Sequence, residues 1–212
     1  MEIEATEVRL ENPVSPIRDR ILSAAFHAFM ENGYGGVSTS DIARRARVSK
    51  RDLYAQFGSK QAMLAACIGA RVERMRRPLE LPVPRSVRAL AAALVTFGRT
   101  LLQEASRPEV LAMYRLAILE AEHSPDVPQA LDSLGYAKNL AALTGLMRAA
   151  RQGGLLGSAS PEAMAEFFLA LLWRGGLLVR MLLRVADAPQ TAEIEQRAND
   201  ATESLLHRYA AP

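Results

Sequence analysis

Cysteine and histidine are scarce in this chain of 212 residues, which has one cysteine and three histidines. The single cysteine, Cys67, cannot form a disulfide within the chain. His27, His123 and His207 lie too far apart in the sequence to form a local metal-binding motif. The sequence therefore contains no redox or zinc framework, and we expect neither a metal site nor a cofactor.

Long uncharged runs are also missing. With histidine counted as neutral, no stretch without a charged side chain is longer than ten residues. The most apolar segment, 167–183, is interrupted by Arg174 and Arg180, which excludes a membrane-spanning helix there. The first seven residues, MEIEATE, are acidic and lack the basic-then-apolar order of a secretory signal. We therefore expect a cytoplasmic protein without a membrane partner.

Apolar residues are plentiful, and the charge is unevenly distributed. Hydrophobic residues make up 50% of the chain and charged residues 23%, which is enough apolar material for a packed core. Residues 1–15 carry a net charge of −3, residues 16–84 carry +6 and residues 85–212 carry 0. A basic segment before a neutral, apolar one is typical of a nucleic-acid-binding module joined to a second domain. Arginines that only solvate helix surfaces would produce the same pattern, so motifs must decide.

Strand signals are nearly absent, so the sequence predicts an all-α protein with about nine helices. Few β-branched runs alternate with a period of two, and no Asn-Gly or Asp-Gly turn separates such runs. Apolar residues instead recur at helical spacing, as with Ile17, Ile21, Ala25 and Phe29. Proline, glycine and capping residues divide the pattern into stretches at about 17–32, 41–46, 49–57, 60–77, 85–105, 108–123, 126–152, 161–185 and 191–209.

Two closely spaced capping signals predict a helix-turn-helix. Residues 38–41 place a serine hydroxyl three residues before an acid, and residues 49–52 repeat the arrangement. Only Arg47 and Val48 separate the two expected helices. Apolar side chains such as Leu53 can hold the pair against the first helix, so that the start of the second helix points outward toward a DNA major groove.

Polar residues around this helix pair form the expected DNA-binding surface. Lysine and arginine can reach phosphates or guanine edges, and tyrosine and threonine can reach phosphates or thymine methyl groups. The amide groups at the start of the fourth helix, together with Lys60, can hold a phosphate. The predicted DNA contacts are Ser38, Thr39, Arg47, Ser49, Lys50, Arg51, Tyr54 and Lys60.

The string GVSTSDIA at 36–43, followed by ARVSKRDLYAQFGSKQAML at 46–64, resembles the TetR/AcrR family of bacterial transcriptional regulators. Segments 115–125 and 171–176 resemble the AefR-like subset of that family. The resemblance implies a repressor that binds a palindromic operator and is released by a small, largely apolar inducer. Family members commonly carry glycine where Arg47 stands, so we expect the turn to form at some conformational cost.

The resemblance also implies a division of the chain into domains. It implies a three-helix DNA-binding domain at 16–64 and a linking helix at 65–84, which ends in the prolines at positions 78, 82 and 84. A ligand-binding and dimerisation domain would occupy residues 85–212. Residues 1–15 are expected to form a disordered acidic arm.

Two apolar helix faces near the C-terminus predict the surface of a homodimer. Each face recurs at helical spacing and could pair with its copy across a two-fold axis, which would form a four-helix interface. The residues assigned to this interface are Phe168, Leu171, Gly175, Leu178, Leu182, Ile194, Ala198, Ala201 and Leu205.

Aromatic residues of the C-terminal domain predict a ligand cavity. Tyr114 and Trp173 carry polar atoms that need partners when buried, which is a common way for a mostly apolar pocket to orient a ligand. The expected lining is Phe97, Met113, Tyr114, Ala117, Leu143, Phe167 and Trp173. Ordinary core packing accounts for each of these residues taken alone, so a domain that only dimerises or binds a protein partner stays open as an alternative.

A helical-bundle metal enzyme is a remote alternative. Glu120 and His123 form a Glu-x-x-His pair on one helix face, as in di-iron bundles. His27 and His207 lack an acid three residues earlier, so the second half of such a site is missing. No glycine-rich phosphate loop or nucleophile elbow is present. We expect a regulator without enzymatic activity, while contact of Glu120 or His123 with a ligand or a single metal ion stays open.

Overall fold

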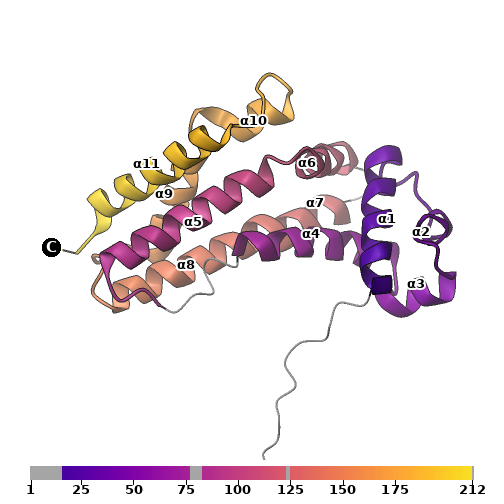
Figure 1. The fold of residues 1–212 in the computed structure, drawn as a ribbon, viewed down its shortest axis with the longest axis horizontal. Coiled ribbons are helices and arrows are strands. Elements are labelled where there is room, and N and C mark those ends of the chain that lie inside the picture. Colours follow the sequence, from indigo (N-terminus) through magenta and orange to yellow (C-terminus); the bar gives the residue numbers. More distant parts are fainter. Residues whose placement is uncertain (1–15, 77–82, 123–124, 212) are drawn as a thin grey trace, which may run out of the picture.

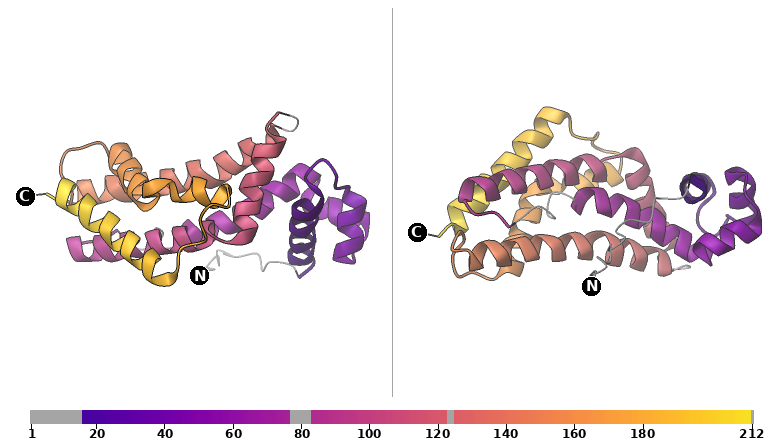
Figure 2. Two further views of the ribbon diagram at one scale, coloured as in Figure 1. Left: turned by 90° about the horizontal axis from the view of Figure 1, so that it is seen from above. Right: turned by 60° about the horizontal axis from the view of Figure 1, so that its bottom comes forward.

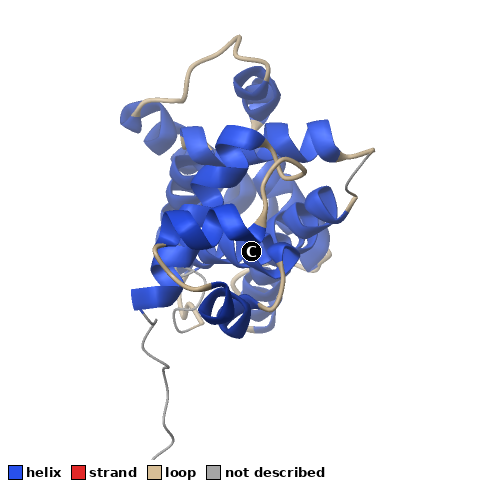
Figure 3. Ribbon diagram, turned by 90° about the vertical axis from the view of Figure 1, so that its right-hand side faces the viewer, coloured by secondary structure: helices blue, strands red, loops and turns tan. Residues whose placement is uncertain are grey.

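The computed structural model describes residues 16–76, 83–122 and 125–211. In these ranges all regular elements are helical apart from one isolated bridge between Leu156 and Ala210, so the all-α prediction is confirmed (Figure 3). None of the described helices is both long and apolar enough to cross a membrane. The expected acidic arm at 1–15, as well as Pro78, Pro82 and His123, lies outside the described residues.

The molecule is elongated, with a small three-helix unit at one end (Figure 1). This unit, here called the head, consists of α1 (Pro16–Asn32), α2 (Thr39–Ala46) and α3 (Lys50–Phe57). Each of its helices turns one apolar face inward, and the innermost side chains are almost without exposed surface. They are Ile21, Ala25, Phe29, Ile42 and Leu53. Burial of these side chains fixes the angle between the helices and leaves the start of α3 at the surface.

Helix α4 (Lys60–Arg76) belongs to the cores of both ends of the molecule. Near its start it packs on α1, where Met63 and Leu64 are buried and the Cys67 thiol donates to the carbonyl of Leu22. Further along it contacts α5, α7 and α8. The expected domain division at 64/65 therefore falls inside one continuous helix.

The larger part of the molecule, here called the body, consists of α5 to α11. Its first elements are α5 (Val87–Ala105), α6 (Pro108–Glu120), α7 (Asp126–Leu131), the π-helical turn η2 (Asp132–Tyr136) and α8 (Ala137–Gln152). Ser86 caps the start of α5, Pro108 opens α6 and Gly153 ends α8, so the punctuation read from the sequence does bound these helices. The expected helix at 126–152 is continuous but contains the π-helical turn.

The rest of the body consists of α9 (Pro161–Leu172), the short 3-10 turn η3 (Arg174–Gly176), α10 (Leu177–Leu182) and α11 (Thr191–Tyr209). The prediction of one unbroken helix over 161–185 is wrong. Gly175 and Gly176 have φ angles of 73° and 66°, in the left-handed region that interrupts a right-handed helix. Glycine adopts this conformation without steric cost, so the glycine pair separates α9 from α10.

Helix α11 packs along α5 and α9 within the same chain (Figures 1 and 2). Gly98 on α5 permits the close approach, because a Cβ atom there would lie 3.1 Å from Leu172 Cδ2 and 3.2 Å from Ala198 Cβ. The three helices bury side chains that the sequence had assigned to a dimer interface, namely Phe168, Ile194, Ala198, Ala201 and Leu205.

These five interface assignments are therefore wrong. An apolar stripe marks the face that a helix buries, and in this molecule the covering surface is the chain's own α5. Of the other assigned residues, Leu171, Leu178 and Leu182 are partly buried against the core and Gly175 is exposed.

Candidate DNA-binding surface and ligand cavity

The two short helices of the head begin at serine caps. Ser38 Oγ accepts a hydrogen bond from the Asp41 amide at 3.1 Å, and Ser49 Oγ accepts one from the Asp52 amide at 3.0 Å. The Asp52 carboxylate in turn accepts from the Ser49 amide, which completes a capping box. The hydrogen bond from the Ser38 hydroxyl is the main cause of a lowered pKa of Asp41. The side chains of Ser38 and Ser49, both predicted DNA contacts, thus serve first to start the helices.

Arg47 occupies the turn between the two helices in a left-handed conformation, with φ 54° and ψ 49°. Its amide closes α2 by donating to the Arg44 carbonyl, and its side chain is exposed. The expected turn geometry is therefore present. A residue with a Cβ atom raises the conformational energy there by about 1 kcal/mol relative to glycine.

The outer face of α3 carries Lys50, Arg51 and Tyr54, all exposed. The Tyr54 hydroxyl is hydrogen-bonded to Thr39 Oγ1 at 3.1 Å, which joins the start of α2 to the middle of α3. Two cations and two hydroxyl groups therefore lie on one exposed surface at the end of the molecule. Such a surface can contact both phosphates and base edges.

Lys60 is engaged inside the protein. Its Nζ donates to the carbonyl of Tyr34 at 2.8 Å and to that of Val37 at 3.1 Å, and it lies 4.3 Å from the centre of the Tyr34 ring. An ammonium group held by two carbonyls and an aromatic ring fastens α4 to the segment before α2. The predicted phosphate contact of Lys60 disagrees with this geometry, because proximity in sequence does not show where a long side chain points.

Not every arginine of the basic segment is available to DNA. Arg18 stacks 4.4 Å from the centre of the Phe57 ring, and Arg45 forms an ion pair with Glu31 at 2.6 Å. Arg44 differs, because 77% of its side-chain surface is exposed and, among the described residues, its ion pair is with Asp41, one turn away on the same helix. Sequence reasoning missed Arg44, although its place in the basic segment was visible.

A cavity of about 150 Å³ lies inside the body, and its wall includes residues from both ends of the break between α9 and α10. Ile68 of α4 also lines it, so the helix that holds the head reaches the cavity. The lining residues are Ile68, Leu101, Ala105, Val110, Met113, Tyr114, Leu131, Gly135, Tyr136, Asn139, Leu169, Trp173 and Leu178. The wall is mostly apolar, with a few polar groups from tyrosine, asparagine and tryptophan.

Three residues of the expected lining, Met113, Tyr114 and Trp173, are brought together around this cavity. Ala117 lies beside it, in an open groove of about 360 Å³ that is here called the outer groove. The outer groove is lined by Tyr114, Ala117, Ile118, Ala121, Pro128, Leu131, Asp132 and Tyr136. Burial raises the pKa of the Tyr114 hydroxyl, and the negative charge of Asp132 raises it further.

The remaining lining predictions are wrong. Phe97 and Leu143 are completely buried, but they belong to the packed core and do not reach the cavity. Phe167 is partly buried and packs edge-on against Tyr209, with ring centres 5.6 Å apart. The sequence identifies apolar residues of the body without showing which of them border empty space.

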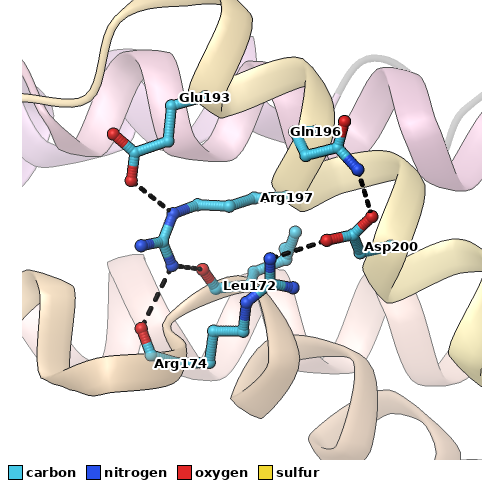
Figure 4. A network of polar contacts seen from close by, with 6 residues as sticks. All are labelled: Leu172, Arg174, Glu193, Gln196, Arg197 and Asp200. Atoms are coloured by element: carbon cyan, nitrogen blue, oxygen red, sulfur yellow. Dashed lines mark hydrogen bonds and ion pairs between the residues drawn. The ribbon is translucent and has the colours of Figure 1, made fainter.

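A network of polar contacts holds the break between α9 and α10 (Figure 4). Arg197 donates to the carbonyls of Leu172 and Arg174, at 3.4 and 3.1 Å. Carbonyl groups at the end of a helix have no amide partner within that helix, and Arg197 supplies donors at the end of α9. Arg174 pairs with Asp200 at 2.6 Å, and this hydrogen bond is the main cause of the lowered pKa of Asp200. Arg115 on α6 fixes the other end of α10 by donating to the carbonyls of Met181 and Leu182.

The Glu-x-x-His pair does not extend into a metal centre within the described part of the chain. No group of three or more possible metal-binding side chains comes together among the described residues. Glu120 lies beside the turn that follows α1, since a Cβ atom on Gly33 would be 3.5 Å from its Oε1. His123 lies outside the described residues.

Comparisons with known proteins agree with this geometry. Residues 21–67 match the model of bacterial regulatory proteins of the tetR family, and residues 92–211 match that of the AefR-like transcriptional repressor, C-terminal domain. A TetR transcriptional regulator from Agrobacterium tumefaciens is 30% identical, with a TM-score of 0.74 over 93% of this chain and 96% of that one. The flavonoid-responsive regulator FrrA is also 30% identical, with a TM-score of 0.71 over 91% and 96% of the two chains.

A similar relative is YvkB of Bacillus subtilis strain 168, an uncharacterized HTH-type transcriptional regulator. It is 24% identical over 190 residues, which cover 85% of this chain and 92% of YvkB. The family models match both the head and most of the body. The chain therefore belongs to the TetR family of helix-turn-helix transcriptional regulators, with an AefR-like C-terminal domain, and is not an enzyme.

Proposed function

We propose that this regulator is a repressor that binds a palindromic operator as a homodimer in the cytoplasm and leaves it when a small, largely apolar molecule fills the cavity. The observation that carries the proposal is the course of α4. One end of this helix is fastened to the head through Lys60, and Ile68, about 12 Å further along, borders the cavity. A ligand that displaces α4 at Ile68 would also displace the head.

The proposed DNA contacts are the exposed side chains of Arg47, Lys50, Arg51 and Tyr54, together with the half-buried Thr39 that is hydrogen-bonded to Tyr54. Arg44 joins them, because its exposed guanidinium lies on α2 beside Asp41. Ser38 and Ser49 would act at the helix starts, where amide groups attract phosphate. Lys60 is left out of this set, because its ammonium group is already held by two carbonyls.

The DNA contacts can be tested on duplexes selected from a random pool by the wild-type protein. Lys50→Ala should weaken binding and reduce the slope of log affinity against log salt by about one, because one phosphate contact is lost. Lys138→Ala is the matched control, since Lys138 is an exposed lysine on α8 in the body. Equal salt slopes for wild type and Lys50→Ala would contradict the assignment.

The proposed dimer surface surrounds α10. Val179, Leu183 and Val185 are between 58% and 67% exposed, and Leu178 and Leu182 beside them are half-buried. Apolar side chains gathered in this way on a surface are typical of an interface between subunits. The exposed sides of Leu171 and Gly175 would extend the same surface.

Leu183→Glu should convert the dimer into a monomer, because it places a charge at the centre of the proposed interface. Sedimentation velocity measures the change directly. Leu119→Glu is the control, since Leu119 is 77% exposed on α6, outside the proposed surface. A dimeric Leu183→Glu protein that still binds DNA would show that the subunits meet elsewhere.

Induction requires a ligand that prefers the DNA-incompetent conformation. A preference of about 100-fold corresponds to about 2.7 kcal/mol per site, which is enough to change operator occupancy strongly in a dimer with two sites. FrrA is named a flavonoid-responsive regulator, and this supports aromatic molecules as the class of inducer. The mostly apolar lining of the cavity supports the same class.

Reciprocity provides the test of induction. If a ligand weakens DNA binding, the selected DNA must weaken ligand binding by the same factor. Aromatic molecules, a flavonoid among them, would be titrated with and without DNA while the emission of Trp173, the one tryptophan of the chain, is recorded. Equal ligand affinities in the two titrations would mean that the ligand is not an inducer. A complete lack of binding would favour a body that only dimerises or binds a protein.

A further inference from the structure

We infer that the inducer is a small aromatic amine, with one ring in the cavity and a protonated nitrogen in the outer groove near Asp132. This inference rests on the proposed function and specifies its ligand. Three observations carry it: the volume of the cavity, the charge at its mouth, and the aromatic side chains that lie where the two spaces meet.

The volume of the cavity limits the part of the ligand that it can enclose. A cavity of about 150 Å³ lined by apolar side chains is large enough for a benzene-sized ring. Leu101, Met113 and Leu169 provide apolar surface, and Trp173 adds an aromatic ring. A second ring of the ligand would have to lie outside, in the outer groove.

The charge of the residues that line the outer groove determines which ring-containing ligands bind most tightly. The cavity and the outer groove share Tyr114, Leu131 and Tyr136 in their linings, so the two spaces are adjacent and lie on either side of these side chains. Asp132 is the only charged residue among the described residues that line either space. It forms no ion pair with any cation that the structure describes, so its carboxylate is available to a ligand. A carboxylate ligand would be repelled at this position, and an ammonium group would be attracted.

The π-helical turn η2 explains how these groups come together. Asp132 and Tyr136 are its first and last residues, and Gly135 between them lines the cavity. Short π-helical turns within α-helices occur frequently at functional sites, because the extra residue changes which side chains face one direction. At this site the turn brings a carboxylate and a tyrosine to the rim of an apolar cavity.

Aromatic side chains add to the preference for a cation. Tyr136 is 53% exposed and borders both spaces, and Tyr114 lies in the wall between them. The negative face of such a ring attracts an ammonium group. Burial raises the pKa of the Tyr114 hydroxyl, and the negative charge of Asp132 raises it further, which agrees with the position of both residues along the outer groove.

Three probes of nearly equal size separate charge from shape: 2-phenylethylamine, 2-phenylethanol and phenylacetate. Each is titrated into the full-length protein while the fluorescence of Trp173 is followed. We expect the amine to bind about tenfold more tightly than the alcohol, since an exposed ion pair and a cation–π contact both favour the ammonium group. Phenylacetate should bind more weakly than the alcohol.

Asp132→Asn tests the source of the preference. It should abolish the advantage of the amine and leave the affinity for the alcohol within about twofold of wild type, because the ring site is unchanged. Asp187→Asn is the matched control, since Asp187 is an exposed carboxylate that borders neither the cavity nor the outer groove. Thermal unfolding of both variants checks that their folds are intact.

Equal affinities of wild type for the amine and the alcohol would overturn the inference, as would a preference that survives in Asp132→Asn or a lack of binding by all three probes. Repeating the titrations with the selected DNA separates this inference from the proposed function. An amine preference that DNA does not affect supports the ligand class and contradicts induction. Binding without charge preference that DNA weakens supports induction and overturns the ligand class.

Discussion

The head and the body of this regulator form their helices in different ways. In the head, α2 and α3 are eight residues each, and a serine and an aspartate three positions apart fix the start of both. In the body, a glycine pair separates α9 from α10, Arg197 of α11 donates to the carbonyls of Leu172 and Arg174 just before that pair, and η2 interrupts a continuous helical run. Short-range hydrogen bonds therefore fix where α2 and α3 begin, whereas contacts between residues far apart in the sequence hold the break between α9 and α10. We therefore expect single substitutions in the two regions to differ in their effects on stability and DNA binding.

Removing a large core side chain from the body should have the largest effect. Phe168 is completely buried between α5, α9 and α11, so Phe168→Ala should lower the free energy of unfolding by about 3–5 kcal/mol. Because α4 joins the two cores, circular dichroism and Trp173 fluorescence should report one common transition in denaturant. Phe167→Ala, at a partly exposed neighbour, is the control and should cost less. A separate, unshifted transition of the head would contradict the shared core.

Lys50, in the head, and Lys60, at the start of α4, should respond to substitution in different ways. Lys60→Ala removes two charged hydrogen bonds and an aromatic contact, so it should destabilise the protein by about 1.5–3 kcal/mol. Lys50→Ala should leave stability unchanged and reduce only the salt dependence of DNA binding. Chemical denaturation and DNA titration on the same two variants make the comparison. A stable Lys60→Ala protein with a reduced salt slope would restore the sequence-based assignment of Lys60.

The head and the body each contain an arginine in a left-handed backbone conformation, so the same arginine-to-glycine substitution can be made in both. Arg47 in the head and Arg184 in the body both have positive φ angles, 54° and 57°. Arg47→Gly and Arg184→Gly should each stabilise the fold by up to about 1 kcal/mol, because glycine adopts this conformation freely. Only Arg47→Gly should also weaken DNA binding, through the loss of a charge. Equal DNA affinity for the two variants would remove Arg47 from the DNA-binding surface.

The smallest effect should come from Asp200, a partly buried carboxylate. The pKa of Asp200 in the body lies below its usual value of 3.8, because Arg174 and Gln196 donate to the charged form. A lowered pKa in the folded state contributes stability above the unfolded pKa, and this contribution is lost as pH falls through the folded pKa. Asp200→Asn should therefore be less stable than wild type at pH 7, with the difference fading below about pH 4. Urea denaturation at both pH values measures it, and a difference that does not change with pH would point to a packing effect.

The same contrast explains how much could be predicted from the sequence. The capping signals before Asp41 and Asp52 predicted both short helices, and the unusual turn residue Arg47 was identified correctly. The break at Gly175 was missed, because the apolar repeat continues on both sides of it. Five residues assigned to the dimer surface lie in the core, since periodicity cannot distinguish a second subunit from the chain's own α5.

The lining of the cavity was also only partly predictable, because it depends on how side chains of different helices pack together. Tyr114 and Trp173 were identified because each combines a large apolar side chain with a polar atom. Phe97 and Leu143 have the same apolar character and are fully packed. Asp132 and Tyr136 were not identified, because their place at the rim depends on the π-helical turn, for which the sequence carried no recognised signal. Whether an apolar side chain borders a cavity depends on how all the surrounding side chains pack.

The continuity of α4 has a practical consequence for building chimeric biosensors from this regulator. A head exchanged at Phe57, where α3 ends, would arrive without Lys60, Met63 and Leu64, which complete its own core. A crossover placed beyond Ile68 would carry these contacts along and would import a foreign residue into the wall of the cavity. Exchange of DNA specificity in such a chimera is therefore coupled to ligand response. To exchange the head without changing the cavity, the crossover must lie between Leu64 and Ile68, and the contact of Cys67 with Leu22 must be preserved.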